Sequence, residues 1–167
     1  MTHTFQFIPL REDHFELLHT WFTRPHVTEW WNGIETMEDV ETTFREKLKN
    51  PYVFPHLVLL DEKLIGYIQA YVAKTDDPND EWWPDAEEGT VGVDQFIGEA
   101  DLLGQGYGSA FVKDFTDKLL ARDDVKKVQT DPDPTNARAI RAYEKAGFVA
   151  VEGIVTPDGP ALLMIKE

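Results

Sequence analysis

The sequence predicts an α/β fold with a mixed sheet, built as a single domain over residues 1–167. Strand-like and helix-like patterns alternate through the second half of the chain, which is typical of a sheet that contains parallel neighbours. A length of 167 residues is that of one domain with its own core. The composition, with 42% hydrophobic and 12% aromatic residues, is that of a folded globular protein and excludes a disordered chain.

Hydrophobic periodicity places the elements along the chain. Alternating or continuous apolar runs predict strands over 4–9, 56–60, 64–73, 90–97, 126–130, 148–155 and 161–166. Apolar residues spaced three and four apart predict helices over 12–23, 36–48, 109–121 and 137–147. Thr36 is a suitable N-cap and Gly147 a suitable C-cap. The stretches Asp61–Lys63 and TPDGP at 156–160 predict the tight turns of two β-hairpins.

The charge balance limits the partners of the chain. Thirty-one acidic against 16 basic residues give a formal net charge of −15, which repels nucleic acid and anionic membranes and attracts cationic ligands. Acidity also serves solubility, so it is not specific by itself. No apolar run approaches the roughly 18 residues of a membrane span, and the N-terminus lacks the features of a signal peptide. We therefore expect a cytoplasmic protein with neither nucleic acid nor membrane as its partner.

Several kinds of reaction centre are excluded by what the sequence lacks. Without any cysteine the chain has no disulfide, no thiolate metal site and no cysteine nucleophile. The five histidines show no metal-site spacing, and Trp82 stands where a calcium loop over 75–82 would need glycine. We therefore expect no metal. No Gly-x-Ser-x-Gly stretch is present, so a serine nucleophile elbow is excluded as well.

A run of alternating glycines, LLGQGYGSAF at 102–111, leads into the helix expected over 109–121. Glycine is a poor helix former, so Gly104, Gly106 and Gly108 need another reason to be there. Without side chains, a phosphate can approach the unpaired N–H groups of the first helical turn, where the helix dipole adds positive charge. The spacing matches neither a Walker loop nor the dinucleotide fingerprint, and on this run alone a structural turn is an equally good explanation.

The segment 74–89, KTDDPNDEWWPDAEEG, lies between two expected strands. A loop of that length in a compact domain is usually functional or disordered, and its two tryptophans favour a functional loop. Asp80 and the pair Trp82–Trp83 suit a cationic sugar, because carboxylates pair with ammonium groups and indole rings cover the apolar side of the sugar. The pair Trp30–Trp31 offers the same aromatic surface. One tryptophan of each pair is expected to be a core residue.

The second half of the chain resembles the GCN5-related N-acetyltransferases (GNAT). In that superfamily an Arg/Gln-x-x-Gly-x-Gly/Ala loop cradles the pyrophosphate of acetyl-coenzyme A (acetyl-CoA), and a later Asn…Ala…Tyr…Gly-Phe helix lines its other side. Residues 103–108 match the loop, with Leu103 where Arg or Gln is usual, and DPTNARAIRAYEKAGF at 133–148 matches the helix. The resemblance implies a GNAT fold: a central twisted, mostly antiparallel mixed sheet, flanked by helices and ending in a β-hairpin.

The resemblance also implies which residues hold acetyl-CoA, the expected co-substrate. They are Gln95, Phe96, Ile97, Leu103, Gly104, Gln105, Gly106, Tyr107, Gly108, Ser109, Asn136, Ala139 and Tyr143. Tyr143 is the candidate general acid, because a phenol can protonate a thiolate whose thiol has a pKa of about 8.5. From the residue alone, a packed core aromatic is the more frequent role.

Six stretches along nearly the whole chain are similar to the aminoglycoside 6′-N-acetyltransferases. They are 24–31, 65–73, 80–85, 91–98, 127–148 and 156–164. This similarity implies that the acceptor is an aminoglycoside amine and that its acetylation confers antibiotic resistance. The first stretch, RPHVTEWW, is also similar to the hydroxylysine and siderophore acetyltransferases. The alternatives are therefore a siderophore precursor or another small polyamine as acceptor, or a non-catalytic acetyl-CoA-binding domain.

Two carboxylates complete the expected acceptor site. Asp94 interrupts an apolar strand, where a buried unpaired carboxylate is costly, and this indicates an amine partner. The resemblance implies that Asp94 anchors the amine and is a candidate base. Asp131 follows strand 126–130, and a turn or N-cap aspartate is its alternative role. The expected acceptor residues are Trp30, Trp31, Asp80, Trp82, Asp94 and Asp131, in a monomer or homodimer that transfers the acetyl group directly within a ternary complex.

Overall fold

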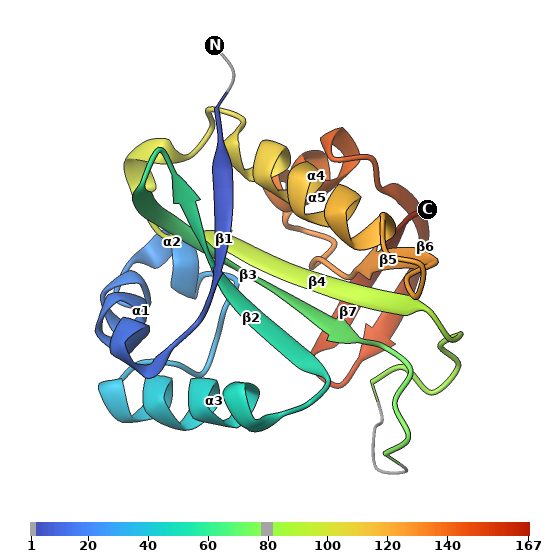
Figure 1. Cartoon of the computed structure of the whole chain (residues 1–167), viewed down its shortest axis with the longest axis horizontal. Helices are drawn as coiled ribbons and strands as arrows, with labels where there is room; N and C mark the ends of the chain where they lie inside the picture. Colours follow the sequence, from blue (N-terminus) through green and yellow to red (C-terminus); the bar gives the residue numbers. More distant parts are fainter. Residues whose placement is uncertain (1–2, 78–81) are drawn as a thin grey trace. The chain divides into compact units, whose positions relative to one another are not determined.

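The computed structural model describes residues 3–77 and 82–167. Within these residues, seven strands form one sheet in the order β1-β2-β3-β4-β5-β7-β6 (Figure 1). The strands are β1 (Phe5–Pro9), β2 (Val53–Leu60), β3 (Lys63–Val72), β4 (Thr90–Ile97), β5 (Lys127–Thr130), β6 (Val149–Thr156) and β7 (Gly159–Lys166). The helices are α1 (Phe15–Trp21), α2 (Pro25–Thr28), α3 (Met37–Lys49), α4 (Tyr107–Leu120) and α5 (Ala137–Lys145), with 3-10 turns η1 (Glu12–His14) and η2 (Ala100–Leu102).

The sheet is mixed, as predicted. β4 runs parallel to β5, whereas β1 with β2, β5 with β7 and β6 with β7 are antiparallel. The first predicted hairpin turn is confirmed at Asp61 and Glu62, whose φ angles of +48° and +72° are those of a two-residue turn that follows the twist of the flanking strands. The predicted fold class, with helices on a mostly antiparallel sheet and a C-terminal β-hairpin, is confirmed.

The helix predicted over 12–23 is wrong in its extent. The segment begins with η1, and the α-helix starts only at Phe15. Arg24 is extended, with φ −93° and ψ 129°, as the residue before a proline prefers, and Pro25 then opens the short helix α2, which the periodicity did not reveal. Helix α4 begins at Tyr107, two residues before the predicted start, so that Gly108 belongs to its first turn.

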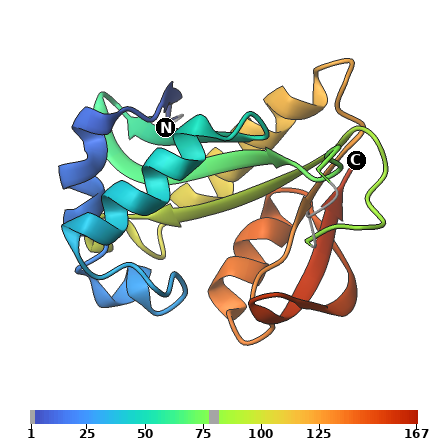
Figure 2. The same ribbon diagram turned by 90° about the horizontal axis from the view of Figure 1, so that it is seen from below.

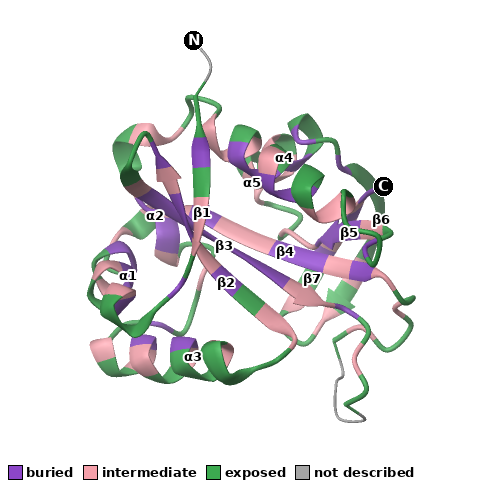
Figure 3. Cartoon of the chain, in the orientation of Figure 1, coloured by how far each residue is buried: buried purple, intermediate pink, exposed green. Residues whose placement is uncertain are grey.

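The chain divides into two compact units, and each is described by itself. Unit 1 consists of residues 1–69 and 95–105, and unit 2 of residues 70–94 and 106–167. In unit 1, α1 packs beside α3 over an aromatic core, and Figure 3 shows the buried side of α3 in purple. Phe22 lies 5.9 Å from Phe44, and Tyr67 stacks on Phe96 at 5.5 Å between ring centroids. Such aromatic pairs stabilise a core beyond the area that they bury.

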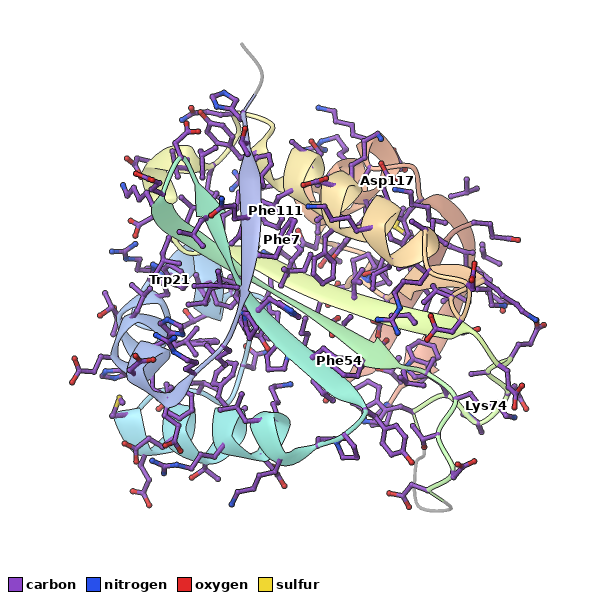
Figure 4. The ribbon with its side chains drawn as sticks, in the orientation of Figure 1. Phe7, Trp21, Phe54, Lys74, Phe111 and Asp117 are labelled. Carbon is purple, nitrogen blue, oxygen red and sulfur yellow. The ribbon has the colours of Figure 1, made fainter. Side chains whose placement is uncertain are left out.

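In unit 2, α4 packs against β5 and α5, and Figure 2 shows α5 beside the hairpin of β6 and β7. The buried face of α4 carries Phe111, which is labelled in Figure 4, and Phe115. The buried Lys166 at the end of β7 donates to Thr116 Oγ1 and Asp117 Oδ1, both at 2.8 Å, and so ties the last strand to α4. A buried cation needs such partners, because burying an unpaired charge is costly.

No helix in the described part of the chain has both the length and the apolar character that crossing a membrane requires.

A reciprocal pair of hydrogen bonds closes the N-terminus of α3, as predicted for Thr36. Its Oγ1 accepts from Asp39 N at 3.1 Å, and Asp39 Oδ2 accepts from Thr36 N at 2.9 Å. We expect Thr36→Ala to lower the free energy of unfolding by about 1 kcal/mol, measured by urea denaturation, because the cap is lost. Thr42→Ala, at an exposed position within the same helix, is the control and should change it by less than about 0.5 kcal/mol. Equal losses in both variants would contradict the capping role.

Candidate active site

One face of the sheet in unit 2 carries a cluster of polar side chains from three neighbouring strands. Gly92 of β4 is in register with Gln129 of the parallel strand β5. Side chains two residues apart share a face, so Asp94 and Asp131 follow on the same side of these strands. Tyr71 of β3 crosses Gly92, because a Cβ atom added there would lie 1.9 Å from the Tyr71 ring. The missing side chain of Gly92 is therefore what lets the Tyr71 ring reach β5.

The Tyr71 hydroxyl hydrogen-bonds to the side chains of Gln129 and Trp83. An indole N–H can only donate, so the Tyr71 oxygen accepts from Trp83, and this bond ties Trp83 to the sheet. Burial, together with the negative charges of Asp94 and Asp131, raises the pKa of Tyr71 well above its ordinary value. Tyr71 is therefore a neutral hydroxyl at physiological pH.

Asp131 is a strongly perturbed carboxyl group of this face. Burial first, and then the charges of Asp94 and Asp158, raise its pKa from the ordinary 3.8 to about 8. Asp158 lies in the turn between β6 and β7, so a third carboxylate acts on the same group. At neutral pH Asp131 therefore keeps a proton. A cation placed among these carboxylates would offset their mutual repulsion and favour the deprotonated form of Asp131.

The parallel pairing of β4 with β5 is short. Its register runs from Thr90–Lys127 to Gly92–Gln129, and beyond it the hydroxyl of Thr130 donates to the carbonyl of Val93 at 3.0 Å. Gln129 is only 5% exposed, and its Nε2 has no hydrogen-bond partner among the described residues. Gln129 therefore adds a buried polar side chain to this end of the strand pair.

The glycine loop prepares the N-terminus of α4 for an anion. Gly104 and Gly106 have φ angles of +74° and +84°, and Gly106 is the N-cap of this 14-residue helix without a side-chain cap. A Cβ atom added at either glycine would meet no atom within 4 Å, so the loop is open. Ser109 Oγ turns back to donate to Gly106 O at 3.0 Å. The N–H groups of a first helical turn have no acceptor within the helix, and these residues therefore fit a diphosphate group.

Helix α5 packs against α4, and the last three predicted acetyl-CoA residues lie at its N-cap and within it. Asn136 is its N-cap, and the side-chain oxygen accepts from Ala139 N at 3.2 Å. Tyr143 is 4% exposed and meets the ring of Phe148 edge-on at 5.4 Å. The packed setting of Tyr143 is that of a core aromatic, so a role as an acid stays a prediction.

In unit 1, the tryptophan pair after α2 divides as predicted. Trp31 packs on the aromatic core, with its ring 5.2 Å from Phe96 and 5.8 Å from Tyr67, whereas Trp30 is 37% exposed. Trp31 also lines a cavity of about 260 Å³, together with Phe22, Thr28, Asn32, Gly33, Ile34 and Glu35. Aromatic and polar groups thus share one recess in this unit.

The chain was compared with known proteins. The family model "Acetyltransferase (GNAT) domain" matches residues 11–156. The chain belongs to the GNAT acetyltransferases.

Individual GNAT relatives are similar over nearly the whole chain. An aminoglycoside N(6′)-acetyltransferase type 1 of Klebsiella pneumoniae is 39% identical over 162 residues, which are 94% of this chain and 80% of the relative. The solved structure of AAC(6′)-Ib in complex with paromomycin and acetyl-CoA has a TM-score of 0.89 and 37% identity, over 98% of this chain and 93% of that one. An N-hydroxyputrescine acetyltransferase of Acinetobacter baumannii is 26% identical over 150 residues, 90% of this chain and 67% of the relative.

The structure of this GNAT chain brings some predicted site residues together. Asp94 and Asp131 share one face, and the negative charge of each raises the pKa of Tyr71. Asp80 lies outside the described residues, Trp82 is 41% exposed, and Trp83 contacts Tyr71. The side chain of Phe96 lies in the aromatic core of unit 1, so only its backbone remains for a ligand. No group of His, Asp or Glu residues that could hold a metal occurs among residues 3–77 and 82–167.

The polar face also contains residues that sequence reasoning missed. Tyr71, Gln129 and Asp158 belong to it, and none stood out as a site residue. The available signal for Tyr71 was Gly92, since a glycine inside a strand often marks the close approach of another group. For Asp158 the sequence predicts only a place in a turn.

The raised pKa of Asp131 predicts how stability depends on pH. The folded state binds this proton more tightly than the unfolded chain, so the free energy of unfolding should fall as pH rises from about 4 to about 8. Asp131→Asn removes the titration, and at pH 8 it should raise the free energy of unfolding by at least about 1.4 kcal/mol, the equivalent of one pKa unit. Urea denaturation at pH 5 and pH 8 measures both effects.

Asp133→Asn is the matched control, because hydrogen bonds from Thr135 lower the pKa of Asp133 and the variant should therefore gain no stability at pH 8. A pH dependence that is identical in the wild type and Asp131→Asn would contradict the assignment.

Proposed function

We propose that this chain is an acetyl-CoA-dependent N-acetyltransferase that acetylates the 6′-amine of aminoglycosides and so confers resistance to them. The observation that carries the proposal is the crowding of Asp94, Asp131 and Asp158, which leaves Asp131 with a raised pKa and favours a cationic ligand. The 39% identity to an aminoglycoside N(6′)-acetyltransferase over 94% of the chain supports the same acceptor.

Acetyl-CoA supplies the acetyl group as a thioester. The loop from Leu103 to Ser109 would hold its pyrophosphate through backbone amides, because the αL glycines leave that turn open. Gln95, Phe96 and Ile97 would contribute backbone contacts, and Asn136, Ala139 and Tyr143 the contacts from α5. The solved relative AAC(6′)-Ib, which binds acetyl-CoA, is 37% identical over 98% of this chain and supports this role.

The chain can perform the transfer with two groups. An amine attacks only as the neutral base, so Asp94 takes a proton from the bound ammonium group. The new N–C bond forms as the C–S bond breaks, and Tyr143 gives a proton to the departing thiolate. The proton that the acylated nitrogen then releases restores the neutral Tyr143 hydroxyl. The chain has no cysteine to carry an acetyl group, which favours direct transfer between the two bound substrates.

The acceptor would be held by charge and by aromatic surface. Asp131 would pair with an ammonium group of the aminoglycoside, and Asp80 would add a second carboxylate. The exposed rings of Trp30 and Trp82 offer faces for the sugar, and half-buried Trp31 offers an edge. Tyr71, as a neutral hydroxyl beside the carboxylates, would orient the amine.

A second candidate acceptor is a hydroxylated polyamine. It is favoured by the similarity to an N-hydroxyputrescine acetyltransferase, which is 26% identical over 90% of this chain. A linear diamine carries fewer cationic groups than an aminoglycoside and would not engage several carboxylates at once. The choice of acceptor therefore separates the two functions.

The direct test is release of coenzyme A with kanamycin, spermidine and N-hydroxyputrescine as acceptors. We expect turnover with kanamycin, and a fall of about 10- to 100-fold in kcat/KM for Asp94→Asn and for Asp131→Asn, because each carboxylate contributes a charge-assisted hydrogen bond of about 1.5–3 kcal/mol. Asp133→Asn is the control and should retain activity.

Two results would contradict the proposal. One is normal acetylation of kanamycin by both the Asp94 and the Asp131 variants. The other is a wild type that ignores aminoglycosides yet acetylates N-hydroxyputrescine.

The role of Tyr143 is tested by Tyr143→Phe. Loss of the general acid should lower kcat by about 100-fold and leave the affinity for coenzyme A, measured by calorimetry, nearly unchanged. Because Tyr143 is buried, the midpoint of thermal unfolding of the variant is measured as well. Tyr52→Phe, outside the site, is the control. Full turnover of Tyr143→Phe under conditions where chemistry limits the rate would mean that another group or water protonates the thiolate.

A further inference from the structure

Two side chains of the RPHVTEWW segment hold the backbone of β4 at the point where the strand ends. Arg24 Nη1 donates to the carbonyl of Gly98 at 2.7 Å and to Glu99 Oε2 at 2.9 Å. His26 Nε2 lies 2.9 Å from the carbonyl of Ile97, and since a carbonyl only accepts, this nitrogen is the donor. Two consecutive carbonyls are thus held from α2 and the residue before it, within unit 1.

Trp21, labelled in Figure 4, fixes the same stretch from α1. A Cβ atom added at Gly98 would lie 2.2 Å from the indole, so the ring lies directly on this backbone. Trp21 Nε1 donates to Glu99 Oε1 at 3.2 Å, while Gly98 N donates to Ile65 O of β3 at 2.8 Å. The Glu99 carboxylate therefore accepts from both Arg24 and Trp21, and these bonds lower its pKa.

The helix that carries these side chains is itself anchored. The amides of Trp30 and Trp31 donate to Val27 O at 3.3 and 3.1 Å, so the chain after α2 continues its turns. Trp31 then meets the ring of Phe96 edge-on at 5.2 Å. Arg24 and His26 consequently reach β4 from a fixed base.

The location of these contacts gives them a role beyond packing. Ile97 is the last residue of β4, which carries the proposed acetyl-CoA residues Gln95 to Ile97, and Gly98 follows it. Both residues precede η2 and the first residues of the glycine loop. The carbonyl groups at an exposed strand end can form hydrogen bonds with water. Here the half-buried guanidinium of Arg24 binds one of them instead, although burying a charged group costs free energy. The direction of the backbone after Gly98 determines the position of Leu103 to Gln105.

We propose that Arg24 and His26 are positioning residues for acetyl-CoA. By binding the carbonyls of Gly98 and Ile97, they fix the backbone from Gln95 to Gln105 in the conformation that binds acetyl-CoA. They touch neither substrate, and they act on affinity through the backbone. This inference rests on the proposed function, in which those residues contact acetyl-CoA.

The test is the affinity for coenzyme A, measured by calorimetry without an acceptor. Arg24→Met should weaken it by about tenfold, because a charge-assisted hydrogen bond to the backbone is lost. In steady-state assays the KM for acetyl-CoA should rise similarly, with kcat at saturation within about twofold of the wild type. Arg45→Met, which breaks the exposed pair with Glu12 at 2.6 Å on the same unit, is the matched control and should bind coenzyme A normally.

His26 supplies a second pair of variants in case Arg24→Met folds poorly. His26→Leu should weaken coenzyme A binding, and His26→Gln, which keeps a donor, should restore most of it. Wild-type affinity in folded Arg24→Met or His26→Leu overturns the inference, as does equal weakening by the Leu and Gln variants at position 26. If the wild type itself fails to bind coenzyme A, the proposed function fails together with the inference, so the two failures are distinguishable.

Discussion

Like charges on one face of a sheet are the constraint on which this site depends. The register of β4 with β5 puts Asp94 and Asp131 on the same side, and Asp158 adds its charge from the hairpin turn. The free protein accommodates them by keeping a proton on Asp131 and a neutral hydroxyl at Tyr71. Such a face is costly without a ligand, and proteins retain costly arrangements chiefly where binding or catalysis requires them.

Much of the fold could be predicted from local patterns. The strand over 90–97 was predicted with its observed bounds, because its apolar run is bounded by glycines and acids. The first helix was overextended, since periodicity does not distinguish the 3-10 turn η1 and the turn after Trp21 from the α-helix between them. Asp94 was identified because an aspartate in an apolar strand is unusual. Gln129 looks like an ordinary strand residue, and only the register and the reach of the Tyr71 ring bring it into the cluster.

The glycines of this chain serve two opposite purposes that their spacing does not distinguish. Gly104 and Gly106 have positive φ angles and open space around them, so they leave room for something outside the chain. Gly92 and Gly98 are covered by the rings of Tyr71 and Trp21, so they leave room for the chain itself. A sequence pattern can predict the first kind, because the loop precedes a helix. The second kind depends on which residues of other strands and helices lie above the glycine.

Gly92 and Tyr71 also constrain each other in evolution. Every substitution of Gly92 by another amino acid introduces a Cβ atom, and at this position that atom would collide with the Tyr71 ring. A substitution at Gly92 therefore requires the Tyr71 side chain to move or to be replaced by a smaller one. The two positions are coupled in evolution, because the cost of a change at Gly92 depends on the residue at position 71.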